Sequence, residues 1–372
     1  MLRPDALIAG GGPAGAAVAL QLARAGRRPL LVDRQRERAD PVCGGFMGGD
    51  AIASLAALGI DVQGLGAHPI TRARIFAGRR VAEAPLPFQA AGLSRACLDE
   101  HLLTLAAAAG AGIERGVTIR QAFPDRLTVD LADGASLTGD ALFLATGKHE
   151  LRGAARPVAM GNDPALGLRT RLEPGEALLH GLTGVIELHL FRHGYAGLLL
   201  QEDGGANLCL SVAQSRLKAA GGDPARLIEE IACETPVLGD RFAGATSVGP
   251  WVSIARVPYG WRARQTTPGL FRLGDQAAVI ASLAGDGVAI ALASAARAAR
   301  DYLREGPAGA VTYQPGFARQ TARPVLLAES LRRTGERPML AGALLALLGQ
   351  APGLITRAAA LTRTDREEVA SP

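Results

Sequence analysis

Lysine and aromatic residues are scarce in this sequence, and their scarcity argues against one class of function. Lys148 and Lys218 are the only lysines among the 40 basic residues, which leaves 38 arginines, and only 4% of the residues are aromatic. Nucleic-acid-binding proteins carry basic stripes with interleaved aromatic residues, and no such stripe occurs here despite a net charge of +5. We therefore expect no nucleic-acid partner and attribute the arginine bias to genome composition.

Paired cysteines and long apolar runs are also missing. The four cysteines, Cys43, Cys97, Cys209 and Cys233, are far apart and lack the spacing of a zinc site or a redox dithiol. We predict no metal site, reduced thiols and a cytoplasmic protein. No apolar run reaches the roughly 18 residues that cross a bilayer, and the amino terminus lacks the layout of a signal peptide. A chain of 372 residues, 48% of them hydrophobic, is long enough for two joined cores.

The first 33 residues carry the most specific pattern in the chain. An apolar strand over 6–9 runs into Gly10-x-Gly12-x-x-Gly15 and an apolar helix, and a second strand ends at Asp33. Such glycines allow a tight turn, a close approach of the backbone to a pyrophosphate, and packing of the helix on the strand; the acid can bind ribose hydroxyls. We predict a dinucleotide site here that is formed by Gly10, Gly12, Pro13, Ala14, Gly15, Asp33 and Arg34.

Further glycine-rich strand ends and helix starts follow along the chain. An apolar strand over 141–144 ends at Ala145-Thr146-Gly147, and another over 269–273 ends at Gly274-Asp275. Gly285-Asp286-Gly287 then opens a long alanine-rich helix, whose positive end can stabilise negative charge. Between residues 34 and 50 lies a glycine-rich loop that contains Cys43 and Gly44. Several ligand-facing segments are therefore expected to meet at one site.

These separated motifs together resemble those of the FAD-dependent oxidoreductases that include p-hydroxybenzoate hydroxylase-type monooxygenases, flavin-dependent halogenases and geranylgeranyl reductases. The likeness covers about residues 1–315. It implies that Asp33 binds the adenosine ribose, that Arg95 lies near the FAD phosphates and that Asp275 binds the ribitol. It also implies that the helix after Gly285 points its amino end at the flavin.

The resemblance implies a Rossmann-like, GR2-type α/β FAD-binding domain with an inserted antiparallel β-sheet substrate domain and a helical C-terminal segment. We assign residues 1–70, 93–150 and 262–315 to the FAD-binding domain, 71–92 and 151–261 to the substrate domain, and 316–372 to the C-terminal segment. The predicted FAD contacts are Gly10, Gly12, Pro13, Ala14, Gly15, Asp33, Arg34, Cys43, Gly44, Arg95, Ala145, Thr146, Gly147, Gly274, Asp275, Gly285 and Gly287.

The expected activity is oxidation or reduction of a hydrophobic small molecule, with NAD(P)H as the electron donor. A monooxygenase is favoured over a geranylgeranyl reductase-like double-bond reductase, because the segment around Tyr195 lacks the aromatic Tyr-x-Trp-x-Phe-Pro signature of those reductases. The Trp-x-Trp-x-Ile-Pro segment of the halogenases is also absent. An NAD-dependent dehydrogenase and a flavin-binding protein without catalysis remain the less favoured alternatives.

No catalytic residue is assigned from the sequence, but Cys43, Tyr195 and Tyr259 are the candidates to line the substrate pocket. Lys148 is interpreted as part of a solvated loop. The apolar run over 339–348 predicts a buried helix that caps the substrate domain. Its alternative is peripheral contact with a membrane surface through the flanking arginines.

Overall fold

The computed structural model describes residues 3–37, 39–158, 161–351 and 353–361. Its amino-terminal part is built on a five-stranded parallel sheet with the order β17-β10-β1-β2-β6. Strands β1 and β10 are buried on both faces, as their uninterrupted apolar sequences require. The strands are β1 (Ala6–Ala9), β2 (Pro29–Asp33), β6 (Gly112–Arg115), β10 (Leu142–Leu144) and β17 (Leu270–Arg272).

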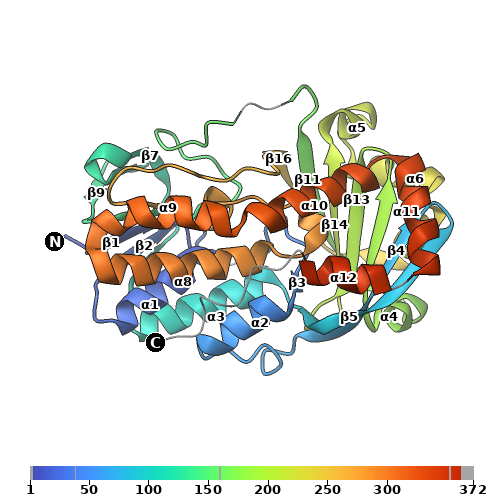
Figure 1. Cartoon of the computed structure of the whole chain (residues 1–372), viewed down its shortest axis with the longest axis horizontal. Helices are drawn as coiled ribbons and strands as arrows, with labels where there is room; N and C mark the ends of the chain where they lie inside the picture. The colour runs from blue at the N-terminus through green and yellow to red at the C-terminus, as the bar shows by residue number, and fades with distance from the viewer. Residues whose placement is uncertain (1–2, 38, 159–160, 352, 362–372) are drawn as a thin grey trace.

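Different elements cover the two faces of this sheet (Figure 1). Ala6 and Ile8 of β1 pack toward the helices α1 (Pro13–Arg24), α3 (Arg95–Ala108) and α8 (Gly287–Glu305). Leu7 and Ala9 pack toward a small antiparallel sheet made of β7 (Ile119–Phe123), β8 (Thr128–Leu131) and β9 (Ser136–Thr138). The layers are those of a Rossmann-like domain, as the sequence predicted.

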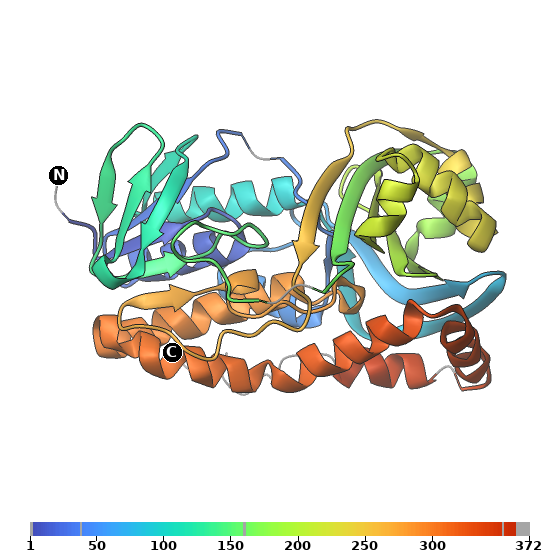
Figure 2. The same ribbon diagram turned by 90° about the horizontal axis from the view of Figure 1, so that it is seen from above.

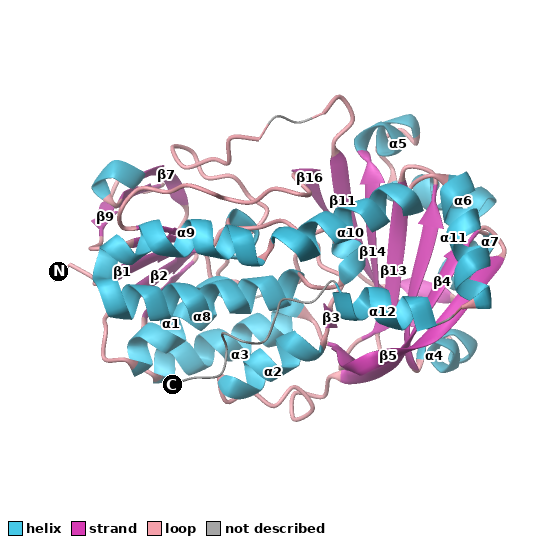
Figure 3. Cartoon of the chain, viewed as in Figure 1, coloured by secondary structure: helices cyan, strands magenta, loops and turns pink. Residues whose placement is uncertain are grey.

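The second part of the molecule is a nine-stranded sheet, drawn in magenta on the right of Figure 3. All its pairings are antiparallel except that of β4 with β12, which is parallel. The predicted antiparallel sheet thus contains one parallel junction, where the early strands join the later ones. The strands are β3 (Phe46–Met47), β4 (His68–Ala77), β5 (Arg80–Gly92), β11 (Ala165–Pro174), β12 (Gly184–Phe191), β13 (Gly194–Leu200), β14 (Ala206–Ala213), β15 (Ala245–Ser247) and β16 (Val252–Val257).

Helices flank this larger sheet on both sides (Figure 2). One side is covered by α4 (Glu176–Leu182), α5 (Gln214–Ala219), α6 (Pro224–Glu234) and α7 (Pro236–Ala243). The opposite side faces α11 (Pro338–Gln350) and α12 (Gly353–Leu361), which contact β4 and β5. The remaining helices are α2 (Gly49–Ala57), α9 (Gly309–Gln320) and α10 (Ala322–Gly335), with short 3₁₀ turns at Pro124–Arg126, Gly274–Gln276, Ser282–Ala284 and Gly306–Ala308.

The predicted C-terminal segment is helical over its described part, and α11 and α12 cap the larger sheet as expected. Residues 362–372 of that segment lie outside the described residues. Within the described part of the chain, no single helix is long and apolar enough to cross a membrane; α11 and α12 pass that test only as a pair, bent by 114°. The domain boundaries assigned from the sequence remain predictions.

Strand β12 separates two different environments because its side chains alternate between the two faces of the sheet. Its even-numbered residues face α11 and α12, whereas Glu187 and His189 lie fully buried on the other side. The Glu187 carboxylate accepts hydrogen bonds from Arg74 (2.9 Å) and Arg241 (3.0 Å), and it lies 3.3 Å from His189 Nε2. Burial opposes ionisation, but the hydrogen bonds from His189 and Arg241 lower the pKa of Glu187 to about 2. The sheet is therefore joined to α7 by a buried ion network.

We expect the Glu187→Ala substitution to lower the free energy of unfolding by about 3–5 kcal/mol, because it leaves Arg74 and Arg241 without their shared carboxylate. Urea unfolding of the full chain measures this loss. The control is Asp140→Ala, which breaks the solvent-exposed pair of Asp140 with Arg3 and should cost no more than about 1 kcal/mol. Equal losses in the two variants would contradict a stabilising role for the buried network.

Candidate cofactor and substrate site

Two glycines of the first turn are required by close backbone packing. Gly10 has φ 109°, and a Cβ placed on it would lie 2.5 Å from the carbonyl oxygen of Ala145. A Cβ on Gly15 would lie 1.9 Å from the carbonyl oxygen of Gly10. The turn after β1, the start of α1 and the end of β10 therefore fit together only when both positions lack a side chain.

Gly12 serves a different purpose from Gly10 and Gly15. Its backbone is extended, with φ −73°, and it caps the amino end of α1. The nearest atom to a Cβ at Gly12 would be Arg95 Nη2, at 3.1 Å, which belongs to a flexible side chain. Packing within the protein does not demand a glycine at this position. The space above Gly12 instead suits the close approach of a pyrophosphate to the helix amino end.

Asp33 lies at the carboxyl end of β2, next to the glycine turn. Its Oδ2 accepts a hydrogen bond from the backbone N–H of Gly11 (2.5 Å), and its Oδ1 accepts one from Gln35 (2.7 Å). Arg34 Nη2 lies 2.8 Å from His149 Nε2, and the Thr146 hydroxyl donates to the His149 carbonyl (2.8 Å). The predicted ribose-binding carboxylate is thus held in place at the turn, beside the loop that follows β10.

Two ion pairs line the middle of the site. Arg95 bonds Asp99 (2.7 Å) on α3, and Lys148 bonds Asp275 (3.2 Å) across the site. Burial opposes both positive charges, but the facing carboxylates hold the pKa values of Arg95 and Lys148 above their usual range. The interpretation of Lys148 as part of a solvated loop is wrong, because its side chain is only 23% exposed and is drawn inward by Asp275. Both cations line the cavity beside the glycine turn, and each is paired with a carboxylate.

The far end of the site is formed by Gly285, Gly287 and the Cys43–Gly44 loop. Gly285 has φ 74°, and a Cβ on it would lie 2.5 Å from the ring of Phe46. Nothing lies within 4 Å of a Cβ placed on Gly44 or Gly287, so these backbones border open space. Gly287 begins the 19-residue helix α8, whose positive amino end faces that space. The open cradle along the chain of glycines fits an extended dinucleotide such as FAD.

The substrate sheet holds the Cys43–Gly44 loop directly. Asn207 of β14 is fully buried, and its Nδ2 donates to the carbonyl oxygens of Cys43 (3.0 Å) and Gly44 (2.8 Å). Arg169 donates in turn to Asn207 Oδ1 (2.7 Å) and to Asp40 (2.7 Å). Asn207 and Arg169 were not predicted from the sequence, because the loop residues that they bond lie 129 or more positions away and no local motif marks them.

One cavity of about 460 Å³ joins the cofactor residues to the substrate sheet. Its lining includes most of the predicted contacts: Gly12, Pro13, Ala14, Cys43, Gly44, Arg95, Ala145, Gly147, Gly274, Asp275, Gly285 and Gly287. Tyr195 and Tyr259 also line it. Five predicted contacts, Gly10, Gly15, Asp33, Arg34 and Thr146, are not part of this lining. Of these, Gly10 and Gly15 lie within the turn, where they allow the close approach of backbone segments.

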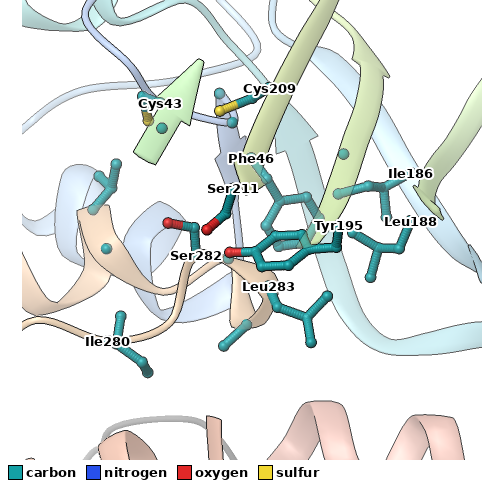
Figure 4. A pocket seen from close by; sticks show the side chains of 18 of the residues that line it. Cys43, Phe46, Ile186, Leu188, Tyr195, Cys209, Ser211, Ile280, Ser282 and Leu283 are labelled. Carbon is teal, nitrogen blue, oxygen red and sulfur yellow. The ribbon is translucent and has the colours of Figure 1, made fainter. Parts of the chain in front are cut away.

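The substrate half of the cavity is apolar. Figure 4 shows Ile186 and Leu188 of β12 beside Tyr195 and Leu283. Further lining residues from β4, β5 and the C-terminal helices are Ala73, Ile75, Leu86, Leu344, Leu347, Leu348, Leu354 and Ile355. Among the described lining residues, the aspartate, lysine and arginine side chains are those of Asp275, Lys148 and Arg95, all in the cofactor half. This half therefore suits an uncharged, hydrophobic ligand.

The Cys209 thiol and the Tyr195 phenol near this boundary are held in their neutral forms. Burial raises the pKa of the Cys209 thiol to about 12, and it raises the pKa of the Tyr195 hydroxyl well above its usual value. Tyr259 donates to the Ser211 hydroxyl (3.2 Å) and lies 3.0 Å from that of Ser282. Within the described residues, no group of three or more His, Cys, Asp or Glu side chains is arranged to hold a metal ion.

Known proteins share the amino-terminal domain of this chain. Residues 3–120 match the family model described as an FAD binding domain. A stretch of 88 residues is 33% identical to squalene monooxygenase from Candida glabrata. That stretch covers 23% of this chain and 18% of the yeast protein, so the match spans about a fifth of the length of the curated relative.

Solved structures share the fold over nearly the whole chain. The flavin-dependent brominase Bmp2 has a TM-score of 0.76 at 16% identity, over 99% of this chain and 96% of the brominase. A geranylgeranyl bacteriochlorophyll reductase-like protein from Thermoplasma acidophilum has a TM-score of 0.69 at 19% identity, over 98% of this chain and 94% of that protein. At these identities the likeness establishes the fold.

The glycine cradle, the family match and the fold together define an FAD-binding protein. Residues 3–120 are accordingly assigned to an FAD binding domain, and the solved structures show that the whole chain shares its fold with the brominase and the reductase-like protein. The FAD-binding domain and the FAD cofactor predicted from the sequence are confirmed.

We expect the Gly12→Ala substitution to weaken FAD binding by about tenfold or more, because the added methyl group enters the space left for the pyrophosphate. Fluorescence titration of the apoprotein with FAD measures the affinity. The free energy of unfolding of the apoprotein, measured in urea, should change by less than about 1 kcal/mol, because the new Cβ meets only the flexible side chain of Arg95. Gly349→Ala in α11, also at a position with open space, is the control and should leave FAD affinity unchanged.

Proposed function

We propose that this protein is an FAD-dependent monooxygenase that hydroxylates a hydrophobic organic substrate and uses NAD(P)H as its electron donor. The observation that carries this proposal is a continuous cavity, which runs from the cofactor cradle at Gly12 into an apolar chamber under α11 and α12. The name of the curated relative, squalene monooxygenase, supports the same reaction class.

FAD, when bound, supplies the redox chemistry, since the reduced cofactor delivers electrons either to O2 or to a double bond. In the balanced hydroxylation, a C–H bond, O2, NAD(P)H and a proton give C–OH, water and NAD(P)⁺. The chain's own residues bind the cofactor, orient the substrate and exclude water from the chamber. Neutral Tyr195 and Cys209 add no charge there.

Double-bond reduction of an isoprenoid or lipid is the second candidate function. It is favoured by the shared fold of the reductase-like protein from Thermoplasma acidophilum and by the Cys43–Gly44 loop beside the cavity. The brominase shares the fold alone, and the halogenase Trp-x-Trp-x-Ile-Pro segment is missing from this sequence. An NAD-dependent dehydrogenase and a flavin-binding protein without catalysis are outcomes of the same experiment.

Anaerobic turnover separates the candidate reactions. We expect FAD-loaded protein with NAD(P)H and substrate to form product only when O2 is present, with one atom of ¹⁸O from labelled O2 in the product. Mass spectrometry of the product measures this incorporation. Product that forms without O2 would show reduction instead. Failure of both pyridine nucleotides to bleach the flavin absorption would contradict NAD(P)H as donor.

We further propose a cytoplasmic protein that contacts an anionic membrane surface through α11 and α12. The outer faces of these helices expose large apolar side chains, namely Met339 (89%), Leu340 (44%), Leu347 (53%) and Leu361 (46%). Exposed Arg337 and Arg357 flank them and complement negatively charged lipid headgroups. Leu347 also lines the cavity, so the apolar chamber lies directly behind this surface.

We expect the protein to co-sediment with vesicles of phosphatidylglycerol and phosphatidylcholine, and much less with phosphatidylcholine alone. The double substitution Met339→Glu and Leu340→Glu should reduce the bound fraction severalfold, because it places two negative charges on the surface that contacts the membrane. The control is Leu326→Glu on α10, which alters a side chain that is 60% exposed outside this surface. Binding that resists the double substitution, or is lost equally in the control, would contradict the proposed surface.

A further inference from the structure

Four hydroxyl groups meet where the apolar chamber joins the cofactor half of the cavity. They belong to Tyr195 of β13, Ser211 of β14, Tyr259 after β16 and Ser282 in the turn before α8. Tyr195 and Ser211 are direct partners in the register of β13 and β14, so their side chains share one face of the sheet. Figure 4 shows the oxygens of Tyr195, Ser211 and Ser282 in the same part of the cavity, and Tyr259 bonds both serine hydroxyls. Elements distant in sequence thus place a polar cluster in an apolar cavity.

The cluster has more donors than its own members use. Tyr259 donates to Ser211, and one further hydrogen bond joins Tyr259 and Ser282. Because each hydroxyl has one proton to donate, these two hydrogen bonds use two of the four protons of the cluster. The Tyr195 oxygen is buried, with its residue 4% exposed, and it lies close to the Tyr259 and Ser282 hydroxyls without a hydrogen bond of good geometry to either. A buried hydroxyl of this kind calls for a partner, which a ligand can supply.

The surroundings of the cluster define what that ligand is. Tyr195 is flanked by Ile186, Leu188 and Leu283 (Figure 4), and the chamber continues along Ile75 and the apolar residues of α11 and α12. Lys148, which lines the cofactor half of the cavity, is already paired with Asp275, and Arg332, which lies over the Tyr259 ring, is paired with Glu329 and Glu336. The cluster therefore offers neutral hydrogen bonds and no unpaired positive charge for a carboxylate or phosphate.

We propose that the cavity binds a neutral lipid with one hydroxyl or carbonyl oxygen, held by the Tyr195 and Ser211 hydroxyls, while its hydrocarbon chain lies in the apolar chamber. This inference rests on the proposed function, because it names the substrate class of the same site. The hydrogen bond fixes one end of an otherwise featureless chain, so that the same segment of every substrate molecule lies beside the cofactor cradle. Tyr195 is thus a specificity-determining residue.

Binding of three twelve-carbon probes to the FAD-loaded full chain tests this assignment. The probes are 1-dodecanol, dodecane and dodecanoate, each measured by displacement of the neutral fluorescent dye Nile red at pH 8. We expect 1-dodecanol to bind roughly tenfold more tightly than dodecane, as one buried hydrogen bond allows. Dodecanoate should bind more weakly than 1-dodecanol, because no unpaired cation meets its charge. The proposal would be overturned if dodecane bound as tightly as 1-dodecanol, or if dodecanoate bound most tightly of the three.

Matched variants test whether the preference for 1-dodecanol over dodecane depends on the hydroxyl cluster in the cavity. In Tyr195→Phe the affinity for 1-dodecanol should fall to that for dodecane, while the affinity for dodecane stays the same. Ser211→Ala should reduce the preference in the same direction, and it serves as the second variant if the first does not fold. Tyr302→Phe removes a tyrosine hydroxyl that bonds the Asp5 carbonyl outside the cavity, and it should keep the full preference. An unchanged preference in both cavity variants would overturn the proposal.

These measurements separate the ligand assignment from the reaction. Probe binding requires neither O2 nor NAD(P)H, so a hydroxyl preference that depends on Tyr195 supports the binding site even in a protein without oxygen-dependent turnover. That result would contradict the monooxygenase function and leave the ligand assignment supported. Oxygen-dependent turnover of a substrate in a protein that shows no hydroxyl preference would instead overturn only the ligand assignment.

Discussion

The close approach of backbone at the first turn is the constraint on which the rest of the structure depends. Gly10 contacts the Ala145 carbonyl, and Gly15 contacts Gly10, so β1, α1 and the end of β10 meet without an intervening side chain. This packing fixes the amino end of α1 and the edge of the parallel sheet at which the other ligand-facing segments gather. The loop after β10 and the turn at Gly274 consequently lie along the same cradle.

The two faces of the larger sheet have different compositions, and one of them borders this cradle. One face carries the apolar wall of the cavity, and the other face buries Glu187 between two arginines. Alternation along β12 accounts for both, because neighbouring residues must point to opposite sides. The sheet thus has a buried ion network on its rear face and an uncharged front face that lines the chamber.

The sequence was most informative where structure depends on neighbours in the chain. The turn at Gly10–Gly15 and the start of α8 at Gly287 are local features, and both were predicted. Contacts between distant segments were not predicted. They include the contact of Asn207 with the Cys43–Gly44 loop, the pair of Lys148 with Asp275, and the parallel pairing of β4 with β12. Each depends on how segments far apart in the chain pack together, and no periodicity or motif in one segment records its partner in another.

Strand β14 carries both sites on one face, since Asn207 holds the cofactor loop while Cys209 and Ser211, two and four residues further on, line the substrate cavity. Any shift of this strand on ligand entry is transmitted to the Cys43–Gly44 backbone. Any coupling that this strand carries is reciprocal by thermodynamic linkage: the factor by which a lipid changes the affinity for FAD equals the factor by which FAD changes the affinity for that lipid. A single strand thus contacts both the substrate chamber and the loop of the cofactor site.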